Sequence, residues 1–160
     1  MQIRICAVGR LRTGPERALI DDYAQRFDRT GRGLGLGPLD IIEVEAKKGL
    51  SEGDALMRVL PAGAPVCALD ERGKTLTSPE FAQLLARWRD QGNSTAAFAI
   101  GGADGLEDAM RARADVTLSL GKMVWPHMLV RVMLSEQLYR AASILAGAPY
   151  HREQRLTALG

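Results

Sequence analysis

The sequence predicts an α/β fold in which a mostly parallel β-sheet is covered by helices on both faces. Five short apolar runs alternate with helical segments, the βαβ pattern typical of a parallel sheet. Several runs, such as residues 95–102, are apolar at nearly every position, as expected for strands buried on both faces. A length of 160 residues with 46% hydrophobic and 25% charged residues fits a single domain, residues 1–160, with its own core.

Residues 2–9 form the first predicted strand, and residues 15–29 form the first predicted helix. The helical segment repeats apolar residues at a spacing of four, which places Leu19, Tyr23 and Phe27 on one face.

A glycine-rich loop leads to the second predicted strand, at residues 39–45. After a basic loop, we expect Ser51 to cap a short helix that ends at Leu60. Asp54, three residues after Ser51, fits this capping pattern.

The third predicted strand is at residues 64–70 and is followed by a polar loop. Ser78 is expected to cap the next helix, with Pro79 in the first helical position and Glu80 behind it. Four large apolar residues at helical spacing predict the buried face of this helix: Phe81, Leu84, Leu85 and Trp88.

The last part of the chain continues the alternation, with strands and helices expected at residues 95–102, 106–114, 115–121 and 127–146. The final helix is apolar on most sides, and Glu136 precedes Arg140 by four, the favourable order for an ion pair. The sheet can cover one side of such a helix, and a second copy of the chain most simply covers the other. We therefore expect a homodimer with this helix at the interface; the alternative is a helix buried within a single core.

Charge and composition exclude some classes of protein. The net charge is +2, but residues 122–160 hold five basic and two acidic residues, a balance that permits a polyanionic partner. The apolar runs are too short for a signal peptide or a membrane span, so we expect a cytoplasmic protein without a membrane partner. Cys6 and Cys67 lie in strand-like runs without nearby histidines, which favours buried reduced thiols over a metal site.

Ligands of parallel sheets lie beyond the carboxyl ends of the strands, here Leu69–Asp70, Gly101–Gly102 and the segment from Gly121 onward. The glycines after the fourth strand let the backbone approach a ligand and offer N–H groups at a helix N-terminus. Their G-G-x-x-G spacing differs from the G-x-G-x-x-G that follows the first strand in dinucleotide-binding folds, which disfavours NAD. A tight turn without a ligand is the alternative.

The loop from Leu120 to Pro126 offers main-chain hydrogen-bonding groups and apolar walls from Met123, Val124 and Trp125. A flat heteroaromatic ligand such as adenine needs this combination. Trp125 could equally belong to the core.

The C-terminal segment carries Tyr150, His151, Arg152 and Arg155. Tyrosine and histidine can stack on a base, and arginine can hold a phosphate or a base edge. A solvated terminus is the alternative.

Three stretches together resemble one known family: "IGGADGL", "LSLGKMVWPHMLVRVMLSEQLYRAASI" and "PYHRE". They are similar to the bacterial large-subunit rRNA pseudouridine-N3 methyltransferases of the SPOUT superfamily. "ICAVGRLR" and "VCALDERGK" resemble the first and third strands of that family, so the likeness covers essentially the whole chain. The glycine turn alone is not specific, whereas the long helical motif followed by "PYHRE" is.

The resemblance implies that the C-terminal part threads into a trefoil knot, that S-adenosylmethionine binds in the knot, and that the enzyme is a homodimer. The positions that match the cofactor site are Leu69, Gly101, Gly102, Gly121, Lys122, Met123, Val124, Trp125 and Pro126. The resemblance implies that two segments face 23S rRNA on assembled ribosomes: the start of the last helix and the "YHRE" segment. The "YHRE" segment could come from the partner subunit.

The implied reaction moves a methyl group to N3 of a pseudouridine, and the N3 proton must leave. Histidine exchanges protons near neutral pH, and the chain has only His127 and His151. The resemblance favours His151 as the acceptor, with Tyr150, Arg152, Arg131 and Arg140 around the RNA. His127 could cap the helix or line the pocket.

Two departures from the family are visible: Val124–Trp125 replace a frequent hydroxyl residue, and residues 154–160 extend past the usual end. Three alternatives stay open: a SPOUT enzyme with another RNA target, a non-catalytic RNA- or nucleotide-binding module and, as a distant third, an NAD-dependent enzyme.

Overall fold

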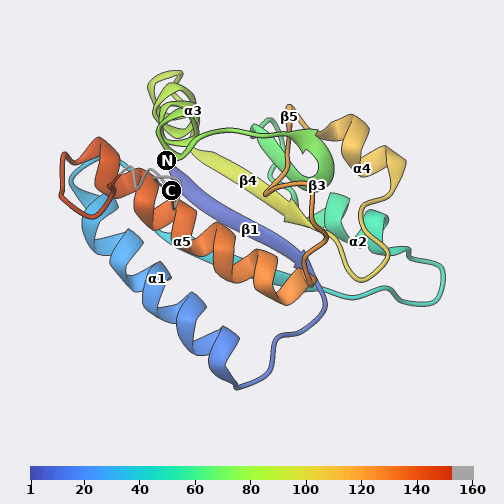
Figure 1. Ribbon diagram of the computed structural model, residues 1–160. Helices are drawn as coiled ribbons and strands as arrows, with labels where there is room; N and C mark the ends of the chain where they lie inside the picture. The colour runs from blue at the N-terminus through green and yellow to red at the C-terminus, as the bar shows by residue number, and fades with distance from the viewer. Residues whose placement is uncertain (153–160) are drawn as a thin grey trace.

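Figure 1 shows the computed structural model, which describes residues 1–152 as one five-stranded sheet between two layers of helices. The strands are β1 (Gln2–Val8), β2 (Leu39–Val44), β3 (Val66–Lys74), β4 (Thr95–Ile100) and β5 (Val116–Leu118). The helices are α1 (Pro15–Arg32), α2 (Glu52–Val59), α3 (Ser78–Asp90), α4 (Asp108–Arg113) and α5 (His127–Leu145). All paired strands run parallel in the order β2-β1-β4-β3-β5, which confirms the predicted fold class.

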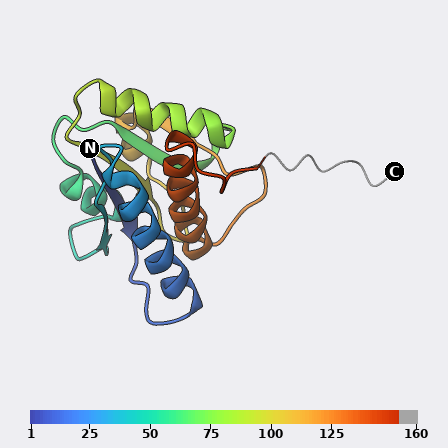
Figure 2. The same ribbon diagram turned by 90° about the vertical axis from the view of Figure 1, so that its left-hand side faces the viewer.

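The two faces of the sheet have separate apolar cores because successive strand residues point to opposite sides. Ile3 and Ile5 of β1 belong to the core under α1, α3 and α5, together with Phe27. Cys6 and Val8 belong to the smaller core under α2 and α4. Figure 2 shows α1 and α5 side by side with α3 across them, and their residues pack against one another.

The flanks of α5 are covered by its own chain, because α1 and α3 pack on either side of it. Leu134 and Leu138 are fully buried there, whereas Met128 and Leu129 in the first turns are each 39% exposed. The ion pair predicted within this helix is confirmed, with Arg140 Nη2 2.6 Å from Glu136 Oε1. The start of α5 is therefore the part whose apolar surface remains uncovered in one chain.

The cap of α3 differs by one residue from the prediction. Thr77, not Ser78, is the N-cap: its hydroxyl accepts a hydrogen bond from the Glu80 amide, and Glu80 accepts one from the Thr77 amide. The Ser78 hydroxyl instead donates to Gln137 of α5 at 2.7 Å. A threonine and a serine side by side both satisfy a local capping pattern, and the tertiary contact decides between them.

The predicted N-cap of α2 is confirmed, since the Ser51 hydroxyl accepts a hydrogen bond from the Asp54 amide at 3.1 Å. On the apolar face predicted for α1, Phe27 is buried but Leu19 is 46% exposed, while Ile20 beside it is buried. A four-residue spacing alone does not fix the rotation of a helix on its sheet.

Strand β3 extends past Asp70 through a segment that was expected to be a loop. After an irregularity its last residue, Lys74, pairs with Leu118 of β5 and accepts a hydrogen bond from the Ser119 amide at 2.8 Å. Here the two segments lie so close together that a Cβ on Gly73 would lie 2.6 Å from the Thr117 carbonyl oxygen. Strand β5 is shorter than the predicted strand, since it spans only Val116–Leu118 of residues 115–121.

Both cysteines are free and fully buried, as predicted. Burial raises the pKa of the Cys6 thiol to about 11 and that of the Cys67 thiol to about 12. Among the helices of the described residues, none has the length and hydropathy needed to cross a bilayer.

Candidate functional site

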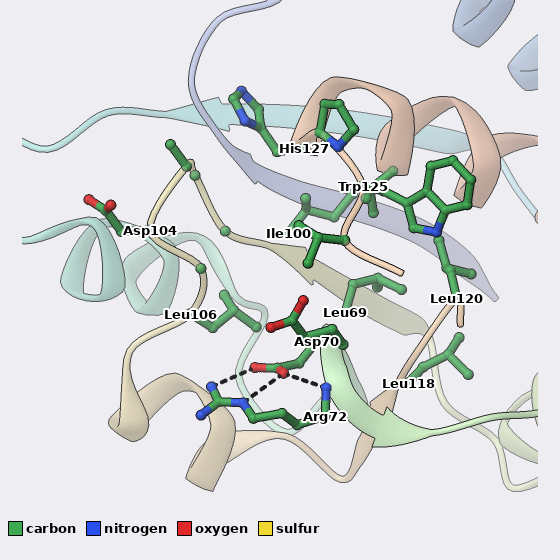
Figure 3. Close-up of a pocket in the computed structure, with 18 of the residues that line it drawn as sticks. Leu69, Asp70, Arg72, Ile100, Asp104, Leu106, Leu118, Leu120, Trp125 and His127 are labelled. Carbon is green, nitrogen blue, oxygen red and sulfur yellow. Dashed lines mark hydrogen bonds and ion pairs between the residues drawn. The ribbon is translucent and has the colours of Figure 1, made fainter. Parts of the chain in front are cut away.

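A cavity of about 710 Å³ lies beyond the carboxyl ends of β4 and β5 and beside residues 69–72 in the second half of β3. Its walls come from the three strand-end segments that the sequence indicated, as Figure 3 shows. All of the predicted cofactor-binding residues except Lys122 line it: Leu69, Gly101, Gly102, Gly121, Met123, Val124, Trp125 and Pro126. Lys122 lies exposed in the same loop. The volume is that of pockets that hold cofactor-sized molecules.

The glycine turn after β4 brings bare backbone to the cavity. A Cβ on Gly101 would lie 2.6 Å from the Gly105 carbonyl oxygen, so no larger residue fits without a shift. The Gly105 amide donates to the Gly102 carbonyl at 3.0 Å and closes the turn. The expected helix N-terminus is not part of this turn, because α4 starts only at Asp108. Any main-chain donors therefore come from the loop.

The opposite wall is the loop between β5 and α5. The Ser119 hydroxyl fixes its first turn by accepting from the Gly121 amide at 3.1 Å and donating to the Gly121 carbonyl at 2.8 Å. Beyond this turn, Met123 is 73% and Val124 78% exposed, and Trp125 is 41% exposed. Trp125 is thus not a core residue, and an apolar wall this exposed indicates a surface that a ligand or partner covers.

Sequence reasoning missed several apolar groups that line the same cavity: Ile100, Leu106, Leu118, Leu120 and Val130. Most of these residues sit at or just beyond the strand ends. Their signal was the apolar character of the strand-end segments themselves, but an apolar residue in a buried strand does not reveal that it faces a pocket.

Asp70 of β3 is a charged residue in the wall of the cavity, and its side chain is 6% exposed. It accepts hydrogen bonds from the Arg72 amide at 2.9 Å and from Arg72 Nε at 3.1 Å, as drawn in Figure 3. Arg111 Nη1 lies 3.5 Å from Oδ2, the second carboxylate oxygen of Asp70. The hydrogen bond from Arg72 lowers the pKa of Asp70 below its usual value. Asp70 is therefore a carboxylate at neutral pH and unsuited to donate a proton.

His127 begins α5 and lines the cavity. Arg131, one turn further, is only 2% exposed and does not reach the solvent. Its guanidinium donates to Glu43 at 2.7 Å and to the carbonyls of Val8 at 2.9 Å and Gly9 at 2.6 Å. These contacts occupy Arg131 within the chain, so they argue against the expected contact with RNA and favour a structural role.

The C-terminal segment docks on the far half of α5. The Tyr150 hydroxyl donates to Glu136 at 3.1 Å. Burial and, to a smaller extent, the negative charge of Glu136 raise the pKa of Tyr150 to about 12. His151 Nδ1 lies 3.2 Å from Arg140 Nη1, and its Nε2 is buried without a partner among residues 1–152. Arg152 is exposed, and residues 154–160, including Arg155, lie outside the described residues.

The cavity and this segment are therefore apart in one chain. His127 and Arg140 are separated by roughly 20 Å along the helix axis at 1.5 Å per residue, and neither Tyr150, His151 nor Arg152 lines the cavity. Of the predicted site residues, the structure brings the cofactor set together and leaves the predicted catalytic set elsewhere.

A second groove, of about 510 Å³, lies between α1, α3 and α5. It is lined by apolar residues that include Leu19, Phe81, Val132 and Met133. Among residues 1–152, no group of three or more His, Cys, Asp or Glu side chains is placed to hold a metal ion.

Comparison with known proteins gives concordant results. A family model described as "Predicted SPOUT methyltransferase" matches residues 1–151. A protein of Dinoroseobacter shibae named "Ribosomal RNA large subunit methyltransferase H" is 66% identical over 95% of this chain and 99% of its own length. A protein of Ruegeria pomeroyi with the same name is 64% identical over the same shares.

Among solved structures, a probable methylase family protein from Haemophilus influenzae superposes with a TM-score of 0.52 at 12% identity. The match covers 97% of this chain and 72% of that one. At this identity the likeness concerns the fold alone.

Proposed function

Because the chain belongs to the SPOUT methyltransferase family, we propose that it methylates N3 of a pseudouridine in 23S rRNA with S-adenosylmethionine as donor. The observation that carries the proposal is the convergence of three strand-end segments on one cavity with an exposed apolar wall. The names of relatives at 66% and 64% identity support rRNA of the large subunit as substrate. Assembled ribosomes, and hence the cytoplasm, are the proposed setting, and residues 1–160 the methyltransferase domain.

The residues of the cavity fit the proposed cofactor. The main chain of the Gly101–Gly105 turn and of the loop from Gly121 to Pro126 would bind the polar edges of the nucleoside. Leu69 and the apolar wall around Trp125 would enclose its flat ring. When bound, S-adenosylmethionine supplies an electrophilic methyl group, and holding it against the base accounts for most of the acceleration.

Methyl transfer forms a bond between N3 and the methyl carbon while the bond from sulfur to that carbon breaks, and the N3 proton needs an acceptor. We assign this proton to His151, because the segment that carries the family resemblance contains this histidine and an imidazole exchanges protons near neutral pH. Tyr150 would stack against the base, and Arg152 would hold a phosphate. Arg140 and Glu136 keep Tyr150 and His151 in place through the contacts given above.

This assignment requires two subunits, because the cavity and His151 lie at different ends of α5. We propose a homodimer in which the apolar start of α5 and the groove beside it are covered by the partner. The exposed Met128 and Leu129 support this interface. Each cavity would then be completed by Tyr150–Arg152 of the other subunit. Membership of the SPOUT family supports the further proposal that the C-terminal part is knotted.

The decisive experiment supplies labelled S-adenosylmethionine with assembled ribosomes, free subunits or naked rRNA, and maps the product by mass spectrometry. We expect one methyl group on N3 of a single 23S pseudouridine, with assembled ribosomes as the best substrate. Methylation of another RNA would show that the proposed substrate is wrong. Cofactor binding without any methyl transfer would show that the protein is a binding module and not an enzyme.

The shared site is tested by mixing two variants, Gly101→Ala, altered in the cavity, and His151→Ala, altered in the tail, at an S-adenosylmethionine concentration too low to support Gly101→Ala alone. If subunits exchange freely, half of the dimers are mixed and each holds one intact site, so about a quarter of wild-type activity returns. A mixture as inactive as its two parents contradicts a site made by two subunits.

A further inference from the structure

Two exposed basic loops lie at the carboxyl ends of the strands, the end of the sheet where the cavity is found. One connects β1 to α1 and presents Arg10 and Arg12; the other connects β2 to α2 and presents Lys47 and Lys48. Since all the strands are parallel, both loops leave the sheet at the carboxyl ends of the strands (Figure 1). The cavity lies at this same end of the sheet. We call these four residues the basic rim.

The two loops are joined to each other where they leave the sheet. The Gly9 amide donates to the Val44 carbonyl at 2.8 Å, and Arg10 Nε lies 3.6 Å from Glu45 Oε1. Lys47 and Leu50 then form a closed turn through mutual main-chain hydrogen bonds of 2.9 Å. The four basic side chains therefore extend from two loops that start side by side at the sheet.

The backbone that carries the two arginines is firmly held. Leu11 between them is only 7% exposed, and its amide donates to the Glu43 carboxylate at 2.6 Å. Its carbonyl accepts from Arg17 at 3.2 Å. A buried leucine between two exposed arginines fixes the positions from which both cations project into solvent, which lowers the entropy cost of binding a partner.

The charges of the basic rim are largely unpaired. Within residues 1–152, no ion pair involves Arg12, Lys47 or Lys48, and the pair of Arg10 with Glu45 is solvent-exposed and hence weak. By contrast, Arg17 and Arg26 on α1 are each paired with an aspartate one turn away. Unpaired cations on an ordered surface are suited to bind phosphates.

We propose that the basic rim binds phosphates of the substrate RNA and holds its backbone beside the nucleotide that enters the cavity. This inference rests on the proposed function, since it takes RNA as the substrate. Phosphate contacts fix register and supply affinity but do not read bases. The basic rim would therefore act on RNA binding and not on cofactor binding or on the choice of base.

The test compares wild type with two variants, Arg10→Gln/Arg12→Gln and Lys47→Gln/Lys48→Gln. The variant Arg58→Gln/Arg87→Gln is the control, because both residues are exposed, have no ion pair among residues 1–152, and lie near the C-terminal ends of α2 and α3. It removes the same net charge at the opposite edge of the sheet. Methylation of ribosomes is measured over a range of salt concentrations, with S-adenosylmethionine affinity by calorimetry.

We expect each basic-rim variant to raise the KM for ribosomes several-fold. The slope of log affinity against log salt concentration should fall by about two, because each variant removes two cations and each cation neutralises one phosphate. The kcat at saturating ribosomes and the cofactor affinity should equal those of wild type. A KM and salt slope that match wild type, or that match the control, overturn the proposal.

Failure of the proposed function is recognised separately. If wild type methylates no rRNA, the same salt titration is carried out on direct binding of ribosomal RNA. Weaker binding by the basic-rim variants than by the control then still supports a phosphate-binding surface, and equal binding refutes it.

Discussion

Arg131 Nη1 lies 2.7 Å from Glu43 Oε2, although the two residues are 88 positions apart in the chain. The same guanidinium binds the carbonyls at the end of β1, so one side chain ties the start of α5 to the carboxyl ends of two strands. Because α5 begins at the wall of the cavity, this ion pair fixes where that wall lies.

Replacing Glu43 should destabilise the protein strongly. Glu43→Gln leaves the nearly fully buried guanidinium of Arg131 without a counter-charge, which costs about 3 kcal/mol in comparable buried pairs. Urea unfolding followed by circular dichroism measures the decrease in stability. Glu45→Gln, which removes a 53% exposed carboxylate from the same strand end, is the control and should change little. Equal stability of the two variants would show that the pair is not important.

The same pair predicts a pH dependence of stability. Burial alone would raise the pKa of Glu43, but hydrogen bonds from the Leu11 amide and Arg131 lower it below its ordinary value of 4.5. A depressed folded-state pKa contributes stability above the unfolded value, and this contribution disappears as the pH falls through the folded value. The difference in unfolding free energy between wild type and Glu43→Gln should therefore be constant above pH 4.5 and shrink below it. A difference that does not change on acidification contradicts this account.

The glycine turn is predicted to be essential for cofactor binding. Gly101→Ala places a methyl group 2.6 Å from the Gly105 carbonyl oxygen, so the turn must move where it lines the cavity. We expect S-adenosylmethionine affinity, measured by calorimetry, to fall by about tenfold or more, equivalent to about 1.4 kcal/mol. Gly33→Ala is the matched control, because nothing lies within 4 Å of its added Cβ. Unchanged affinity in Gly101→Ala would place the cofactor elsewhere.

His151→Ala should separate chemistry from cofactor binding. If His151 accepts the N3 proton, kcat falls by about 100-fold or more while cofactor affinity is retained. Arg152→Ala should instead raise the KM for ribosomes, as expected of a residue that binds phosphate. Single-turnover methylation with saturating cofactor, over a range of ribosome concentrations, measures both effects. A wild-type rate in His151→Ala would assign the proton to another group, with His127 in the cavity as the next candidate.

Local pattern alone predicted the order and type of all ten elements, because each segment shows an apolar run, a helical spacing or a helix cap of its own. It also predicted where the cavity lies, since parallel strands bring their carboxyl ends to one edge. Leu69, Gly102 and Trp125 are far apart in the sequence, yet all three line the cavity.

Other features depended on contacts between distant segments. Arg131 shares a helical stripe with His127 and looks available for RNA in the sequence, but the ends of β1 and β2 enclose it. Thr77 caps α3 because Ser78 is engaged by α5, and Tyr150 and His151 dock far from the cavity. A sequence determines which residues can form a given contact. Which of them are buried, and against what, is decided only when the sheet brings distant segments together, because burial is a property of the whole packed chain.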